Sequence, residues 1–408
     1  MIFALKEENF VVIDNGSWRI KARKGVPKEI FEIPSLFLPT DNIEKRALSS
    51  SNDNNNILSL SSLSIADTKL PTTNPVSVFT SSPIIDRGEI KKWDELEALW
   101  RHILLKEFGI KRSRNECPVM ITTPSWWTKE QHERIAQIFF EHFNVPGLYI
   151  ADQALMAIYG CGSVSGLVVD IGHGKTDITP IFESIVQYHA IQTLPIGGQD
   201  IDKYLLTLLQ SDEQLLSEYD DMLDIDFARA IKEIIGGFPD EEEEQSHTGD
   251  EERKEVEYLG KRFTIGSERL RAAEPFFNPS LVGKDEVPSL PDAINTAIYS
   301  CDIEKRSALW ENIALTGGSS LLKGLKERLQ KELEVFLIMS ENAGDYQFKE
   351  AKFIKIPDYL TNFKERQDLA AFLGASMVAK LVFGDPKNFI SKVDYNEIGP
   401  TAVHTKSY

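Results

Sequence analysis

Two segments of this chain share one pattern: an apolar strand, then Asp, any residue and Gly, a short turn and a returning strand. The first segment is VVIDNGSWRIK around Asp14, and the second is LVVDIGHGKTD around Asp170. The runs before each aspartate are almost continuously apolar, as in strands buried inside a sheet. The segments lie about one domain length apart. The pattern therefore predicts a duplicated domain in which two equivalent hairpins face each other, with room for a polyanion between them.

The residues of these hairpins suit a phosphate and a magnesium ion. Glycines let a turn adopt positive φ and bring N–H groups close to phosphate oxygens, which we expect of Gly16, Gly172 and Gly174. Asp14 and Asp170 are placed to face Mg²⁺ through its retained waters. Lys21 begins the returning strand and can reach a phosphate as a point charge. One such hairpin alone is more often an ordinary structural turn.

A third glycine-rich turn makes the combination more specific. The segment WENIALTGGSSLLKGLKERLQKEL predicts a strand, a Gly317-Gly318 turn and a helix capped by Ser319 or Ser320. Such a turn suits a nucleotide base and its α-phosphate at a helix N-terminus. In LPIGGQDIDKYLLTLL a helix is expected to open at Asp200, where Gly198 and Asp200 can meet a ribose.

The remaining patterns alternate strands with amphipathic helices, which indicates an α/β fold. Two polar stretches interrupt it. Residues 41–82 are rich in Ser, Asn and Thr, which predicts a mobile insertion. Residues 239–257 carry ten acidic and two basic side chains. The acidic stretch is either a solvated loop or an electrostatic contact for a basic partner.

Composition limits the function classes. The chain has 408 residues and a formal net charge of −18, which disfavours direct binding of nucleic acid because no basic stripe is evident. Its 3 cysteines are widely spaced and include no CxxC pair, which argues against a disulfide framework and a thiolate zinc site. The charged N-terminal segment does not resemble a signal peptide, and no apolar run is long enough for a transmembrane helix. We therefore expect a soluble intracellular protein.

The chain resembles actin and the actin-related proteins over nearly its whole length outside the two insertions. DNGSWRIK is similar to actin's first phosphate loop, DIGHGKTD to its second, and LTGGSSLLKG to its third nucleotide loop. PIGGQDIDKYL resembles the ribose-side segment, and AIKEI resembles the adenosine-side helix. WDELEALWRHI, FFEHFNVPGLYIADQA and FISKVDYNEIGPTAVHTKSY match the family as well.

The resemblance implies an actin-like ATPase fold, α/β in class, with two duplicated ribonuclease-H-like domains around a central nucleotide cleft. Residues 1–160 and 370–408 would form the first domain, and residues 161–369 the second. It implies ATP with magnesium as the cofactor, and nucleotide contacts for Asp14, Gly16, Ser17, Lys21, Gln153, Asp170, Gly172, Gly174, Thr176, Gly198, Asp200, Lys232, Glu233, Gly317, Gly318 and Ser319. Asp14 and Asp170 would meet the metal through water.

Both phosphate loops depart from actin. Actin has glycine at the position of Trp18, so this hairpin must be reshaped or strained. Ile171 replaces a serine whose hydroxyl could bond a phosphate, and His173 replaces an aspartate that could help hold magnesium waters. These changes predict weak or absent binding of Mg-ATP.

Hydrolysis is expected to be poorer still. Gln153 matches a glutamine that helps to place the attacking water in actin, but Asp177 stands where actin has a histidine. A carboxylate there adds negative charge where the reaction must neutralise it. Lys175 either directs a cation at the cleft or is a solvated surface lysine. No catalytic residue is assigned, and the protein is expected not to be an enzyme.

The resemblance also indicates partners. Actin's DNase-binding loop is replaced by the Ser/Asn-rich stretch, so filament formation is not expected. A hinge helix and a C-terminal helix would frame an apolar groove for an amphipathic partner helix, lined by Tyr159, Val378, Leu381 and Val382. The alternative is that these residues pack against each other in the core.

Among the family, the segments SVSGLVVDIGHGKTDITPI and FISKVDYNEIGP look most like nuclear actin-related proteins of fungal chromatin remodellers, the nearest class being actin-related protein 9 of SWI/SNF and RSC. The resemblance implies a nuclear, structural and regulatory subunit that pairs with a second actin-related protein. Together they would bind the helicase-SANT-associated helix of the motor subunit and support transcription regulation, with no membrane association. A slow ATP-hydrolysing cytoskeletal relative and a subunit of a histone-acetyltransferase complex are the alternatives.

Overall fold

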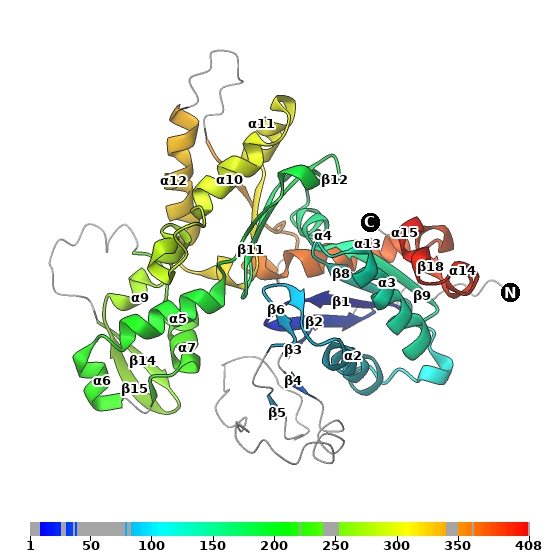
Figure 1. Ribbon diagram of the computed structural model, residues 1–408, viewed down its shortest axis with the longest axis horizontal. Helices are drawn as coiled ribbons and strands as arrows, with labels where there is room; N and C mark the ends of the chain where they lie inside the picture. The colour runs from blue at the N-terminus through cyan, green and yellow to red at the C-terminus, as the bar shows by residue number, and fades with distance from the viewer. Residues whose placement is uncertain are drawn as a thin grey trace. The chain divides into compact units, whose positions relative to one another are not determined.

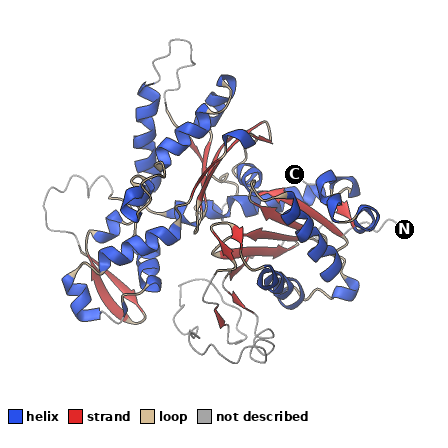
Figure 2. Ribbon diagram, viewed as in Figure 1, coloured by secondary structure: helices blue, strands red, loops and turns tan. Residues whose placement is uncertain are grey.

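A computed structural model describes residues 9–25, 30–35, 37–38, 78–79, 83–219, 222–239, 253–339, 350–360 and 363–406. The chain divides into two compact units, one formed by residues 1–156 and 372–408 and the other by residues 157–371. The divisions fall inside two helices, α4 (Gln153–Gly160) and α13 (Ala370–Val382). Each unit is built around its own sheet (Figures 1 and 2).

The first unit contains a six-stranded sheet in the order β18-β9-β8-β1-β2-β3. Its strands are β1 (Val11–Asn15), β2 (Arg19–Lys24), β3 (Phe31–Pro34), β8 (Val119–Thr123), β9 (Gly147–Asp152) and β18 (Ile390–Ser391). Strand β1 runs parallel to β8 and antiparallel to β2. Every residue of β1 is buried, as its continuous apolar run predicts.

Helices pack against this sheet and bury their apolar faces in its core. They are α2 (Trp93–Arg101) with a π-helical continuation (His102–Glu107), α3 (Lys129–Gln137) with another (Ile138–His142), α14 (Lys392–Ile398) and α15 (Val403–Lys406). The side chain of Thr128 caps α3 by accepting a hydrogen bond from the Gln131 amide. The C-terminal residues after α13 therefore include a strand and two helices, β18, α14 and α15.

The second unit contains a sheet in the order β12-β11-β10-β16-β17, with β13 also paired to β11. Its strands are β10 (Gly166–Ile171), β11 (Thr176–Phe182), β12 (Ile185–Val186), β13 (Gln192–Leu194), β16 (Ile313–Thr316) and β17 (Phe353–Ile354). Strand β10 runs antiparallel to β11 and parallel to β16, just as β1 runs with β2 and β8. The two sheets therefore repeat one plan.

The helices of the second unit are α5 (Gly198–Leu209), α6 (Glu213–Tyr219), α7 (Ile225–Ile235), α9 (Glu268–Arg271), α10 (Leu290–Tyr299), α11 (Ile303–Glu311) and α12 (Leu325–Met339). Apolar residues of α5, α7, α10 and α12 share one core with the sheet. No helix in the described part of the chain is both long and apolar enough to span a membrane.

Short two-stranded sheets complete the fold: β4 (Phe37–Leu38) with β5 (Val78–Phe79), β6 (Ile85–Asp86) with β7 (Glu89–Ile90), and β14 (Lys254–Tyr258) with β15 (Lys261–Ile265). Apart from β5, the predicted polar insertion at 41–82 lies outside the described residues, and so do residues 240–252 of the acidic stretch. That stretch was predicted to extend to residue 257 as a loop, which is wrong because β14 begins at Lys254.

Candidate functional site

The first hairpin places Asp14 near the end of the buried strand β1. One carboxylate oxygen accepts hydrogen bonds from the Thr122 hydroxyl at 2.5 Å and from the Gln153 side-chain amide at 2.8 Å. The other oxygen lies 3.5 Å from the ammonium nitrogen of Lys21. Three residues singled out in the sequence, Asp14, Lys21 and Gln153, are thus brought together. Thr122 of β8 joins them because β1 and β8 are neighbouring parallel strands.

The backbone of this hairpin turn does not adopt the left-handed conformation. Neither Gly16 nor Trp18 has positive φ, so the prediction for Gly16 is wrong and Trp18 fits a reshaped turn without strain of that kind. Glycine is needed at position 16 for another reason: a Cβ there would lie 2.5 Å from the carbonyl oxygen of Arg19. Ser35 holds the turn by donating its hydroxyl to the Gly16 carbonyl at 2.6 Å. Ser17 lies half-buried in the same turn.

The second hairpin turn is held by the elements around it. The Gly172 amide closes the turn by donating to the Lys175 carbonyl at 2.9 Å. The Gly172 carbonyl accepts from the Gly198 amide at 2.9 Å and from the Ser319 hydroxyl at 3.3 Å. Neither Gly172 nor Gly174 has positive φ, which corrects the prediction for both. The turn, the start of α5 and the segment after β16 therefore form one cluster.

The N-terminus of α5 already has partners for its first amides. The helix begins at Gly198, two residues before the predicted start at Asp200. The Gln199 amide donates to the His173 carbonyl at 2.8 Å, and the Gly197 amide donates to the Asp200 carboxylate at 3.0 Å. Lys284 lies 2.8 Å from the other oxygen of Asp200. These groups, which suit a phosphate or a ribose, are engaged within the protein.

The segment after β16 is a 3-10 turn (Gly318–Leu321), not the start of a helix. Helix α12 begins only at Leu325, so neither Ser319 nor Ser320 is its N-cap, contrary to prediction. Gly317 has φ +86°, and a Cβ there would overlap the Asp170 carboxylate. Gly318 has no heavy atom within 4 Å of a Cβ position. Glycine is therefore required at 317 but not at 318.

Lys175 is a buried residue, 9% exposed, and forms an ion pair with Asp177. The hypothesis of a solvated surface lysine is therefore wrong. Asp177 also accepts a hydrogen bond from the Thr193 hydroxyl at 2.7 Å. Burial lowers the pKa of the Lys175 ammonium, while the negative charges of Asp177 and Asp170 act in the opposite direction. The neighbouring Thr176 donates its hydroxyl to the Ile196 carbonyl at 2.8 Å.

Lys232 on α7 has a buried partner that the sequence did not reveal. Its ammonium nitrogen lies 2.6 Å from Asp202 of α5, and the other Asp202 oxygen lies 3.1 Å from Arg229. Lys232 also donates to the Gly198 carbonyl at 3.3 Å, which joins it to the cluster. Glu233 is exposed, without a hydrogen bond or ion pair to another described residue. Asp202 could have been noticed, because a carboxylate among the buried positions of an amphipathic helix requires a cation.

The residues assigned to the partner groove differ in exposure. Leu381 is 75% exposed, whereas Val382 is buried, and Tyr159 and Val378 are half-buried. Leu381 is therefore the apolar side chain of this set with the most surface for a partner. Among the described residues no group of three or more His, Cys, Asp or Glu could hold a metal ion. The three cysteines are all buried and form no disulfide.

These contacts test the fit of Mg-ATP to the residues assigned to it. In the first unit, Asp14 is bonded to Thr122, Gln153 and Lys21. In the second unit, the cations of Lys175 and Lys232 are paired with buried or half-buried carboxylates. A phosphate or a hydrated magnesium ion at these side chains would compete with the contacts that they make within the protein.

Two sheets with one repeated plan, each carrying an aspartate-bearing hairpin, define an α/β protein with an actin-like ATPase fold. The protein-family model described as Actin matches residues 5–408, so the chain belongs to the actin family. It is 29% identical to Actin-related protein 7 of Arabidopsis thaliana over 405 residues, covering 98% of this chain and 99% of that protein. It is 30% identical to Actin-related protein 7 of Oryza sativa subsp. indica over 401 residues, with 98% and 99% covered. The expected fold and the resemblance to actin-related proteins are confirmed.

Proposed function

We propose that this protein is a nuclear, non-catalytic actin-related subunit of an ATP-dependent chromatin-remodelling complex. Its class is that of fungal actin-related protein 9 in SWI/SNF and RSC. It pairs with a second actin-related protein, binds the helicase-SANT-associated helix of the motor subunit and supports transcription regulation. The motifs of the two hairpins and of the C-terminal segment support this class.

The observation that carries the non-catalytic part of the proposal is the ion pair of Lys175 with Asp177. Phosphoryl transfer depends on cations and a correctly placed water at the γ-phosphate. Here the cation of the second loop is bound by a carboxylate, which a hydroxyl from Thr193 holds in turn. Asp177 stands where an actin would place its water-positioning histidine. This supports weak or absent binding of Mg-ATP and no appreciable hydrolysis.

Calorimetry with Mg-ATP and a phosphate-release assay on the purified full chain test this part. We expect neither sub-micromolar binding nor steady turnover. Asp14→Ala is the control, because Asp14 is the carboxylate of the first hairpin. Tight binding and turnover that disappear in Asp14→Ala would favour the slow-ATPase alternative instead.

The partner is tested by affinity purification and mass spectrometry. We expect a remodeller motor subunit and a second actin-related protein, whereas acetyltransferase subunits would favour the other alternative. Leu381→Asp should leave the fold intact, because the side chain is 75% exposed, yet should reduce recovery of the motor subunit. Ile234→Asp, at another exposed apolar position, is the matched control and should recover the motor subunit normally. Wild-type recovery with Leu381→Asp would place the partner surface elsewhere.

A further inference from the structure

A group of cations collects at one place on the first unit. A short 3-10 turn (Arg112–Arg114) follows Lys111, and Arg112 of this turn lines the same cavity as Lys392 of α14. Lys111, Arg112 and Arg114 are exposed, and Lys392 is half-buried. Within the described ranges none of the four forms an ion pair. Even with the exposed Glu141 and Glu397 counted, these residues sum to a positive charge on a chain whose net charge is −18.

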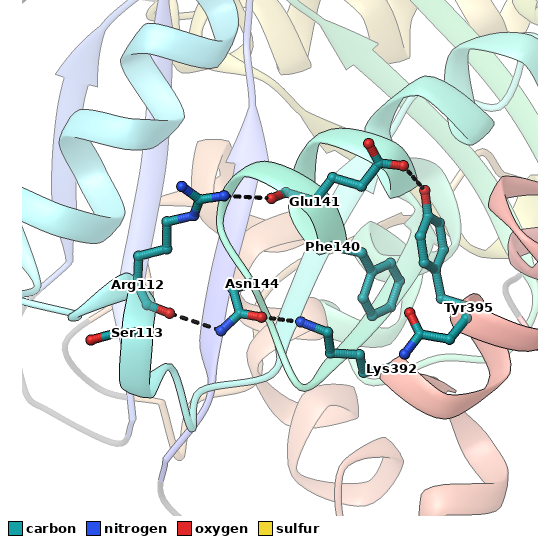
Figure 3. A pocket seen from close by; sticks show the side chains of 8 residues that line it. Arg112, Ser113, Phe140, Glu141, Asn144, Lys392 and Tyr395 are labelled. Carbon is teal, nitrogen blue, oxygen red and sulfur yellow. Dashed lines mark hydrogen bonds between the residues drawn. The ribbon is translucent and has the colours of Figure 1, made fainter.

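The cavity between these cations has a volume of about 810 Å³ (Figure 3). Its lining consists of Arg112, Ser113, Phe140, Glu141, Asn144, Lys392, Tyr395 and Asn396. The rings of Phe140 and Tyr395 are stacked, with centroids 4.5 Å apart and an interplanar angle of 22°. The Tyr395 hydroxyl donates to the Glu141 carboxylate at 2.7 Å. The cavity thus combines two cations, one carboxylate, uncharged polar groups and the edges of two largely buried rings, and its volume is in the usual range for ligand sites.

Hydrogen bonds within the protein hold both cations in place. One guanidinium nitrogen of Arg112 donates to the Glu141 carbonyl at 2.9 Å, and the Asn144 amide donates to the Arg112 carbonyl at 2.8 Å. The Lys392 ammonium donates to the Asn144 side-chain oxygen, and the Lys392 amide donates to the Pro146 carbonyl at 3.0 Å. Because a guanidinium has five donors and an ammonium has three, each cation keeps donors for a ligand. Fixed donors lose little entropy when a ligand binds.

We propose that this cavity binds a short acidic peptide segment of a partner protein. Arg112 and Lys392 would each bind a carboxylate through charge-assisted hydrogen bonds. Phe140 and Tyr395 are only 2% and 7% exposed, so the segment would be held mainly by the cations and the uncharged polar groups of the cavity. None of the lining residues belongs to the nucleotide loops or to the partner groove, and the proposal does not depend on the function proposed above.

A peptide fits these observations better than nucleic acid does. The Glu141 carboxylate lies in the cavity wall, and the exposed Glu397 follows the lining residue Asn396 in sequence. A continuous phosphate backbone would meet this negative charge, and it would meet the net negative charge of the chain at longer range. A segment with a few spaced carboxylates can avoid both.

Fluorescence anisotropy with the full chain tests the proposal. The probe is a fluorescein-labelled, blocked hexapeptide of sequence DEFDEL, and the neutral comparison is NQFNQL. We expect saturable binding of the acidic peptide and none of the neutral one. The double variant Arg112→Gln/Lys392→Gln should bind the acidic peptide at least about tenfold more weakly, because two charge-assisted contacts are lost.

The matched control is Lys380→Gln/Lys387→Gln, which removes two exposed lysines of the same unit and changes the net charge equally. Its affinity for the acidic peptide should equal that of the wild type. Circular dichroism verifies that both double variants are folded. The proposal is overturned if the acidic peptide does not bind or if both double variants lose affinity equally. It is also overturned if an eight-nucleotide thymidine oligomer displaces the peptide at equal concentration, since that would indicate a nucleic-acid surface.

Discussion

The ammonium nitrogen of Lys232 lies 2.6 Å from a carboxylate oxygen of Asp202, and both side chains are almost completely buried. Arg229 binds the other oxygen of the same carboxylate. These contacts connect α7 to α5 beneath the second hairpin turn. They also use a lysine that the family resemblance assigned to the nucleotide. The electrostatics of this site are thus determined largely by contacts within the protein.

Asp202→Asn should lower the free energy of unfolding by about 3–5 kcal/mol, because it leaves two cations near a neutral group in the interior. Urea denaturation measures the change. Asp226→Asn is the matched control, since Asp226 pairs with the same Arg229 but has a side chain that is 51% exposed. It should cost less than about 1 kcal/mol. Equal losses in the two variants would contradict the importance of the buried contact.

Gly317→Ala should destabilise the protein by about 1–3 kcal/mol. Gly317 has φ +86°, and the added methyl group would overlap the carboxylate of Asp170. Gly318→Ala serves as control because nothing lies near its Cβ position and its φ is not positive. We expect a change within about 0.5 kcal/mol for the control. Chemical denaturation measures the free energy of unfolding of both variants. An unchanged free energy of unfolding in Gly317→Ala would refute the prediction.

His132 should make stability depend on pH. It is buried, with a ring nitrogen 3.2 Å from the Thr123 hydroxyl, and burial lowers its pKa from 6.5 to about 4. Between these values the unfolded chain binds a proton that the folded protein excludes, so stability falls as the pH decreases from 6.5 towards 4. The contribution to the slope approaches about 1.4 kcal/mol per pH unit.

Denaturation midpoints measured from pH 4 to pH 7 in His132→Gln and the wild type test this expectation. The variant should lose part of the pH dependence. His142→Gln, which removes a histidine whose side chain is 45% exposed, is the comparison variant and should keep the part of the pH dependence that comes from His132. Identical pH profiles for His132→Gln and the wild type would rule out this histidine as the source.

If Lys175 neutralises the carboxylates of the second hairpin, the variant Lys175→Met should bind magnesium more strongly than the wild type does. Without its ammonium group, Asp177 and the nearby Asp170 would attract a hydrated divalent cation. Millimolar MgCl₂ should therefore raise the melting temperature of Lys175→Met more than that of the wild type. NaCl at the same ionic strength controls for screening. If MgCl₂ raised the melting temperatures of the two proteins equally, Lys175 would not be the group that neutralises these carboxylates.

Local sequence patterns predicted the strands that carry the site. The apolar run ending at Asp14 forms β1, and the run ending at Asp170 forms most of β10, each followed by an antiparallel return. Such hairpins were predictable because their residues are neighbours in sequence and their strand propensities agree with their burial. Helix boundaries were less accurate: α5 starts before Asp200, and α12 starts after Ser320. Bonds to other segments determine those ends.

The use of glycine also differed from expectation. Positive φ was predicted for Gly16, Gly172 and Gly174, yet in this cluster it occurs at Gly317. A sequence shows that glycine is present, but not whether it is needed for backbone conformation or for space. At Gly16 the reason is the close carbonyl of Arg19, which only the folded turn brings near.

The sequence alone determined the two aspartate-bearing hairpins, the α/β fold class and the resemblance to the actin family, because these depend on residue types and local periodicity. The tertiary structure decided which charge meets which partner. Gln153 reaches Asp14 across 139 residues, and Lys232 meets Asp202 on another helix. A buried carboxylate must be compensated by whichever donor or cation the fold places beside it, and one sequence does not specify that neighbour. Whether these side chains were available for a nucleotide could therefore be judged only from the folded chain.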